Sequence, residues 1–84
     1  MSTAHDVVAF LASALVDDVD AVRVTEAEHH GTLVLELFVA PDDLGKVIGR
    51  QGRTAAALRT LAAAAGERAG QKVMLEIREP SRRG

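Results

Sequence analysis

The most informative stretch of the chain is GKVIGRQGR at residues 45–53. Gly49 and Gly52 lie close together in it, and each permits a backbone conformation or a close approach that a side chain would block. A helix is expected to begin directly after Gly52, so its free N–H groups and the positive end of its dipole point toward this loop. Basic side chains add charge at the same place: Lys46, Arg50 and Arg53. The stretch therefore predicts a cradle for a phosphodiester backbone.

Helices are expected on both sides of these glycines. A proline at the first turn favours a short helix over residues 42–48, in which Asp42 and Asp43 are interpreted as helix-start acids. Residues 53–65 predict a second helix, built largely from alanine, and Gly66 is expected to end it. Arg59, almost two turns into this helix, is interpreted as a solvated residue and not as a ligand contact.

The rest of the chain supplies one more helix and a sheet. Apolar residues recur at helical spacing over residues 4–15, and they alternate at strand spacing over residues 22–28, 32–39 and 72–78, with a turn at 29–31. The order helix, strand, strand, helix, helix, strand predicts an α+β fold in which three helices cover one face of a three-stranded sheet. We expect one domain over residues 1–78 and a disordered polar tail over residues 79–84.

Composition and missing motifs exclude several classes of protein. The 84 residues include no cysteine, so neither a disulfide nor a thiolate metal site is expected. No apolar run reaches the roughly 18 residues of a membrane span, and the N-terminus lacks the pattern of a secretory signal, so we expect a cytoplasmic protein. The fingerprints of phosphate-binding and dinucleotide-binding loops are absent as well. We therefore expect no enzyme activity, catalytic residue, metal, cofactor or small-molecule substrate.

The charge of the chain is unevenly distributed. The formal net charge is -2, but the segment from Leu44 to Gly66 contains four basic residues and no acid, so it carries +4 and the remainder carries -6. An acidic body with one basic segment favours a local anion site. Charge alone allows the alternative equally well, namely that the basic cluster is only a solvated face.

The loop also carries a family resemblance. Val47-Ile48-Gly49-Arg50-Gln51-Gly52 matches the Val/Ile-Ile-Gly-x-x-Gly signature of KH domains, and the order of elements, αββααβ, matches the type II KH fold. The chain therefore resembles the KH family, and within it the small bacterial single-domain proteins of the KhpA family. The resemblance implies that the loop clamps about four nucleotides of single-stranded RNA. It implies these RNA-binding residues: Lys46, Ile48, Gly49, Arg50, Gln51, Gly52 and Arg53.

The same resemblance implies a role and partners. Members of this family are regarded as RNA chaperones or post-transcriptional regulators, and they are linked to cell-length and cell-wall homeostasis. They pair with themselves or with a larger KH protein called KhpB or Jag. The only aromatic residues of the chain are Phe10 and Phe38, so we expect no stacking platform, and a single copy should bind RNA weakly with little sequence preference.

An alternative interpretation is a dimerisation module that has a KH fold and weak or no RNA binding. Apolar residues surround most of the helix at residues 53–65, whereas a helix packed by one face should be polar on the other. The sequence does not choose between a homodimer and a heterodimer. The dimer interface is predicted at four residues: Leu58, Leu61, Ala62 and Ala65.

Overall fold

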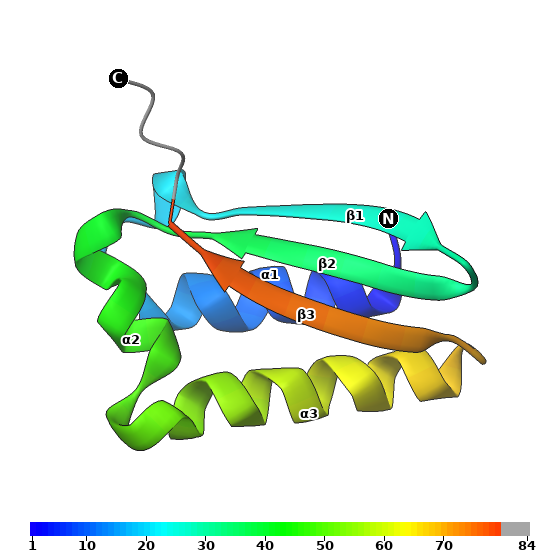
Figure 1. Cartoon of the computed structure of the whole chain (residues 1–84). Coiled ribbons are helices and arrows are strands. Elements are labelled where there is room, and N and C mark those ends of the chain that lie inside the picture. The colour runs from blue at the N-terminus through cyan, green and yellow to red at the C-terminus, as the bar shows by residue number, and fades with distance from the viewer. Residues whose placement is uncertain (80–84) are drawn as a thin grey trace.

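The computed structural model describes residues 1–79 (Figure 1). The helices are α1 (Thr3–Leu15), α2 (Leu44–Ile48) and α3 (Arg53–Arg68), and the strands are β1 (Arg23–His29), β2 (Thr32–Phe38) and β3 (Lys72–Arg78). Short 3-10 turns occupy Val19–Ala21, Pro41–Asp43 and Arg50–Gly52. The predicted α+β fold with the order αββααβ is confirmed. A disordered tail is predicted for residues 79–84, and residues 80–84 lie outside the described residues.

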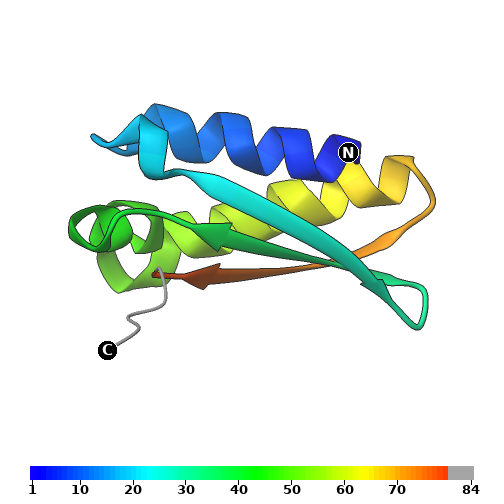
Figure 2. The same cartoon turned by 90° about the horizontal axis from the view of Figure 1, so that it is seen from above.

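The sheet is mixed, with β2 as its central strand. β1 pairs with β2 in the antiparallel sense and β3 pairs with β2 in the parallel sense. The turn between β1 and β2 uses positive φ angles of 51° at His30 and 83° at Gly31, the combination that a tight hairpin favours. All three helices lie on one face of the sheet (Figure 2). Parallel pairing requires a long crossover, and α2, the loop and α3 provide it.

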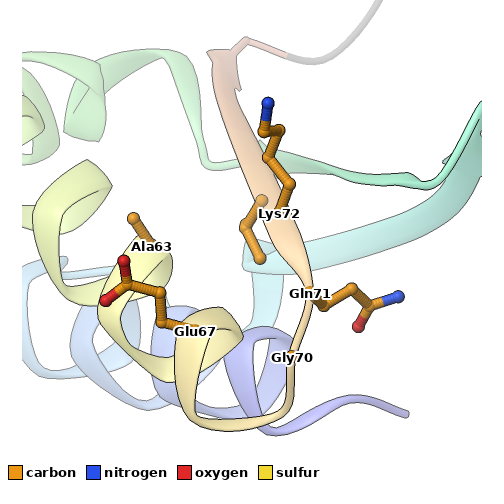
Figure 3. A pocket seen from close by; sticks show the side chains of 6 residues that line it. Ala63, Glu67, Gly70, Gln71 and Lys72 are labelled. Carbon is orange, nitrogen blue, oxygen red and sulfur yellow. The ribbon is translucent and has the colours of Figure 1, made fainter.

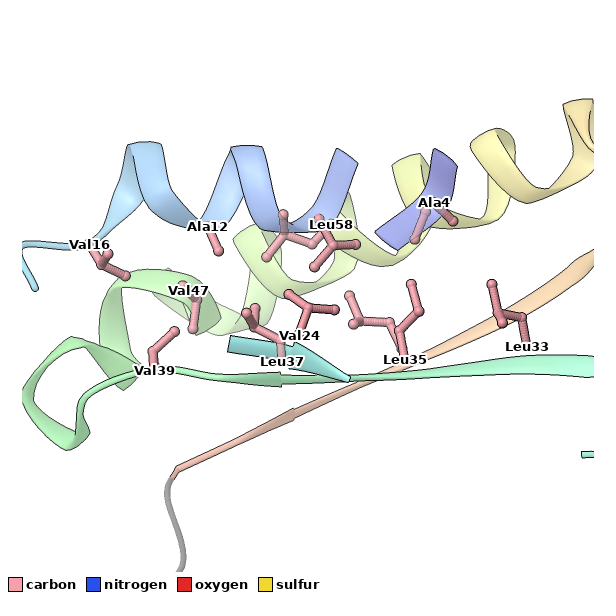
Figure 4. Packing of buried hydrophobic residues seen from close by; sticks show 13 residues of the cluster. Ala4, Ala12, Val16, Val24, Leu33, Leu35, Leu37, Val39, Val47 and Leu58 are labelled. Atoms are coloured by element: carbon pink, nitrogen blue, oxygen red, sulfur yellow. The ribbon is translucent and has the colours of Figure 1, made fainter. Parts of the chain in front are cut away.

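Alternate residues along β2 face the helices and form the centre of the core (Figure 4). α1 adds Val8 and Ala12 to this core, and α2 adds Val47. Because Val47 is fully buried, it fixes the short α2 against the sheet, although a helix of this length has little stability of its own. The buried residues of β2 and the residue after it are Leu33, Leu35, Leu37 and Val39.

The predicted end of the long second helix is wrong, because α3 passes through Gly66 and continues to Arg68. Gly66 is buried, and a Cβ atom there would lie 2.8 Å from the carbonyl oxygen of Gln71 and would overlap the side chain of Val73. Gly66 therefore permits α3 to pack closely on β3. The turn that follows α3 uses a positive φ of 71° at Gly70 instead.

The predicted dimer interface has to be corrected, because two of its four residues are buried in the core and a third is half-buried against it. Leu58 and Ala62 are 3% and 1% exposed and belong to the core. Ala65 is partly buried against the same cluster. Only Leu61, which is 47% exposed, remains available to a partner. Alanine on the other side of α3 explains why the sequence of this helix looked apolar all round.

Candidate nucleic-acid interface

The loop at residues 49–52 joins α2 to α3 along an unusual backbone path. Its positive φ angles are 78° at Gly49, 56° at Gln51 and 74° at Gly52. The N–H of Gly52 donates to the carbonyl oxygen of Gly49 at 3.1 Å and closes the turn. Positive φ is uncommon for a residue with a side chain, so Gln51 holds backbone strain in the middle of the loop.

The two glycines of the loop are needed for different reasons. A Cβ atom at Gly49 would overlap the side chain of Thr54 and would lie 2.9 Å from its backbone nitrogen. Gly49 therefore permits the close approach of the loop to the first turn of α3. At Gly52 a Cβ atom would meet no other atom within 4 Å, so only the positive φ favours glycine there. The space beside Gly52 is open, and a ligand can approach the backbone through it.

The structure brings most of the predicted site residues together around this opening. Arg50, Gln51 and Arg53 are exposed, on the loop and at the start of α3, and Ile48 is half-buried at the end of α2. Within residues 1–79, Arg50 and Arg53 form no ion pair with a carboxylate. Two uncompensated positive charges therefore lie next to the open backbone at Gly52.

Lys46 differs from these arginines because its charge is compensated. Its Nζ atom lies 3.3 Å from a carboxylate oxygen of Asp17 and 3.3 Å from one of Asp43. Hydrogen bonds to these two carboxylates, first to that of Asp17, raise the pKa of Lys46 above its ordinary value. Lys46 therefore ties α2 to the segment that follows α1. Asp17 is far from Lys46 in the sequence, and no spacing rule indicated this pairing.

Asp43, the second partner of Lys46, is buried where α2 meets the segment that follows α1. Its side chain is 3% exposed, and it accepts a hydrogen bond from the backbone N–H of Asp18 at 3.0 Å. This bond is the first cause that holds the pKa of Asp43 below its ordinary value, against the opposing effect of burial, and Lys46 adds to it. The carboxylate is a structural link as well as a helix-start acid, and it positions the helix that leads into the loop.

Asp43→Asn is expected to lower the melting temperature near pH 7 and to weaken the dependence of that temperature on acid. A carboxyl whose folded pKa lies below its unfolded value, near 4, adds stability above that value and loses it as the pH falls through the folded pKa. The melting temperature of the wild type should therefore fall more steeply below about pH 4. Thermal melts followed by circular dichroism measure this, with Asp42→Asn at an exposed neighbour as the control. If the melting temperatures of the wild type and of Asp43→Asn fell equally with decreasing pH, the lowered pKa of Asp43 would be contradicted.

The two aromatic side chains do not belong to the loop. Phe10 on α1 is 73% exposed. Phe38 lies on the face of β2 opposite the core, with the Arg23 guanidinium 4.7 Å from its ring centroid. What the loop presents at the surface is therefore charge, backbone groups, the Gln51 amide and the half-buried aliphatic side chain of Ile48.

Two hollows lie elsewhere on the surface. One of about 320 Å³ lies where α3 ends and β3 begins, and the Glu67 carboxylate is among its lining groups (Figure 3). The other, of about 420 Å³, is a mainly apolar groove on α1 and α3, lined by Thr3, Asp6, Val7, Phe10, Leu11 and Leu61. In the part of the chain that the structure describes, no group of metal-ligating residues could hold a metal ion. Within residues 1–79, no helix is long and apolar enough to cross a membrane.

Comparison with protein families gives a match that spans both the loop and the sheet. The KhpA/KhpB KH-domain family model matches residues 5–77. The chain belongs to this family. This match confirms the family that the loop sequence indicated, and it confirms the type II KH-like arrangement of the fold. The KhpA/KhpB family is not known as a family of enzymes, in agreement with the prediction from the sequence.

Several relatives in this family are named "RNA-binding protein KhpA". That of Aquifex aeolicus is 54% identical over 79 residues, which is 94% of this chain and 100% of the relative. That of Caldanaerobacter subterraneus is 50% identical over 72 residues, 86% of this chain and 96% of the relative. That of Bacillus subtilis is 44% identical over 73 residues, 87% of this chain and 90% of the relative.

A solved structure shares the fold. The chain of Aquifex aeolicus Era superimposes with a TM-score of 0.61 and is 22% identical, over 90% of this chain and 29% of the Era chain. The present chain therefore spans less than a third of Era, and the likeness concerns the fold alone.

Proposed function

We propose that this KhpA-family chain binds single-stranded RNA by gripping the RNA backbone on the loop at residues 49–52. The observation that carries the proposal is the open backbone at Gly52, in a stretch that also contains the exposed residues Arg50 and Arg53. Phosphate oxygens accept hydrogen bonds from backbone N–H groups and stronger, charge-assisted bonds from arginine. Because the N–H of Gly52 already donates to Gly49, the open side of Gly52 would admit a phosphate to the arginines and to the other loop N–H groups, and the Gln51 amide would add another donor.

The remaining site residues support this contact in different ways. Gly49 keeps the loop against Thr54, and so sets the position of the backbone donors. Lys46 holds α2 in place through its two carboxylate partners, so it strengthens the site by position more than by a phosphate contact. Ile48 offers an apolar surface to a base. A grip of this kind, without an aromatic platform, would be weak and tolerant of sequence in a single copy.

The salt dependence of RNA affinity tests the phosphate contact. Three basic contacts at Lys46, Arg50 and Arg53 would give a slope of log affinity against log salt near -2, at about -0.7 per contact on single strands. Because Lys46 is already paired with two carboxylates, we expect two contacts and a slope near -1.4. Fluorescence anisotropy with a labelled oligouridine at several salt concentrations measures this slope. An affinity that does not change with salt would contradict the phosphate contact.

In the cell, we propose that the chain acts as a cytoplasmic RNA chaperone or post-transcriptional regulator. A weak grip on the backbone would let RNA strands exchange partners while they stay bound. The family resemblance extends the proposal to the control of cell length and of the cell wall. Crosslinking of RNA to the protein in its native cell, followed by sequencing, tests this role. Enrichment of transcripts for cell-wall proteins would support it, and a random sample of RNA would contradict it.

A second candidate function, pairing with another protein, is favoured by the groove on α1 and α3. Phe10 is 73% exposed and Leu61 is 47% exposed, and both line this groove. Adjoining apolar side chains of this size mark interaction surfaces more often than single ones do. The partner would be a second copy of the chain or a KhpB/Jag-like KH protein. Light scattering tests pairing with a second copy of the chain. A dimer mass would support this pairing, and a monomer at high concentration would exclude a stable homodimer.

A further inference from the structure

The side chain of Asp17 is exposed, yet it contacts the short helix α2 that leads into the loop (Figure 1). Asp17 follows the end of α1, its side chain is 84% exposed, and its Oδ2 atom lies 3.3 Å from Nζ of Lys46 in α2. An ion pair that is open to solvent adds little to the stability of a fold. The main effect of the Asp17 carboxylate is therefore on the charge of Lys46.

The connection between α2 and the segment after α1 does not depend on the side chain of Asp17. The buried carboxylate of Asp43 makes this connection, because it accepts a hydrogen bond from the backbone N–H of Asp18 at 3.0 Å. This bond is the first cause of the lowered pKa of Asp43, and a backbone hydrogen bond from Asp17 adds to it against the effect of burial. Both donors are backbone groups, so a substitution of the Asp17 side chain leaves them in place.

Lys46, Asp17 and Asp43 form a cluster with one positive and two negative charges, so its net charge is -1. The raised pKa of Lys46, caused first by its hydrogen bond to Asp17, and the lowered pKa of Asp43 keep both of these groups charged at neutral pH. A phosphate near the cluster therefore meets a net negative charge, although Lys46 belongs to it. Without the Asp17 carboxylate the cluster would be neutral, and the ammonium would have one partner instead of two.

Lys46 lies close enough to the loop to reach a phosphate there. It precedes Gly49 by three residues, and the N–H of Gly49 bonds to the carbonyl oxygen of Gly45, so the helical path continues to the loop. Three residues of helix rise about 4.5 Å, and the four-carbon stem of lysine carries its ammonium over a comparable distance. The stem is flexible and the ammonium has three rotatable donors. An ammonium released from Asp17 can therefore share a phosphate with Arg50 and Arg53.

We propose that Asp17 is a positioning residue that limits the affinity for RNA, because its carboxylate holds the Lys46 ammonium away from the phosphate on the loop. This inference rests on the proposed function of the loop. In the wild type the phosphates meet Arg50 and Arg53, while Lys46 stays with its two carboxylates. Asp17 acts through Lys46 and does not itself touch RNA. The restraint keeps the grip on the backbone weak, as exchange of RNA strands on the protein requires.

The experiment measures the salt dependence of oligouridine binding in Asp17→Asn by fluorescence anisotropy. At low salt this variant should bind about fivefold more tightly than the wild type. Its slope of log affinity against log salt should steepen from near -1.4 to near -2, because one further phosphate contact adds about -0.7. Asp18→Asn is the matched control: it removes the same charge at the next residue, which is also exposed but forms no ion pair within residues 1–79. This control should keep the slope of the wild type.

Lys46→Ala shows whether the gain passes through Lys46. Alone, this substitution should leave the slope near -1.4, and in the Asp17→Asn background it should return the slope to that value. Three results would overturn the proposal: an unchanged slope in Asp17→Asn, the same steepening in Asp18→Asn, or a steep slope that persists in Asp17→Asn/Lys46→Ala. A failure of the loop proposal looks different, because Arg50→Asp/Gln51→Asp would then bind RNA like the wild type.

Discussion

Leu58→Asp is expected to abolish folding of the domain. Leu58 is 3% exposed and packs in the core beneath α3. Loss of a buried leucine side chain alone costs about 2–5 kcal/mol, and a carboxylate in the same place adds an uncompensated buried charge. Small domains have free energies of unfolding toward the lower end of roughly 5–15 kcal/mol. Circular dichroism at room temperature should therefore show loss of most of the helical signal.

Leu61→Asp is the matched control, because it introduces the same side chain into the same helix at a position that is 47% exposed. This variant should fold, with a melting temperature close to that of the wild type. If the wild type is a dimer through the groove on α1 and α3, light scattering should show that Leu61→Asp is a monomer. A folded Leu58→Asp variant would contradict the packing of α3 on the sheet.

The double variant Arg50→Asp/Gln51→Asp is expected to lose most RNA binding while it stays folded. It retains both glycines, and aspartate tolerates the positive φ of 56° at Gln51 better than most residues do. One positive charge is exchanged for two negative charges at the place where a phosphate is proposed to bind. Both side chains are exposed, and exposed substitutions usually change stability by only about ±0.5 kcal/mol. Anisotropy titrations with oligouridine measure the loss.

A second double variant separates a local effect from a change in net charge. Arg68→Asp/Ala69→Asp makes the same change in charge at two exposed residues at the other end of α3. It should lose much less affinity than the loop variant, because its new charges lie away from the proposed phosphate. Both variants should keep the circular dichroism spectrum of the wild type. Equal losses of affinity would mean that net charge, and not the loop, determines binding.

The sequence predicted the fold well where local chemistry decides the structure. Alternation identified β2 and β3, and the spacing of Gly49 and Gly52 identified the turn between two helices. These features depend on residues close together in the chain, so a single sequence contains the information needed to infer them.

The features that the sequence did not predict depend on contacts between distant segments. Gly66 looked like a helix stop, and only its contact with Val73 shows why glycine is needed inside α3. Lys46 looked like a phosphate ligand, but Asp17 and Asp43 compensate its charge. An alanine-rich helix does not reveal which of its sides is buried, so Leu58 was placed at an interface rather than in the core.

The most direct test of the loop as the RNA site is a titration of isotope-labelled protein with oligouridine, followed by the chemical shifts of backbone amides. We predict that the largest changes occur at Gly49, Arg50, Gln51, Gly52 and Arg53, and that they saturate together. Amides around Phe10 and Leu61 on the groove should change little. Changes that gather on that groove or on the open face of the sheet, with the loop amides unmoved, would contradict the account.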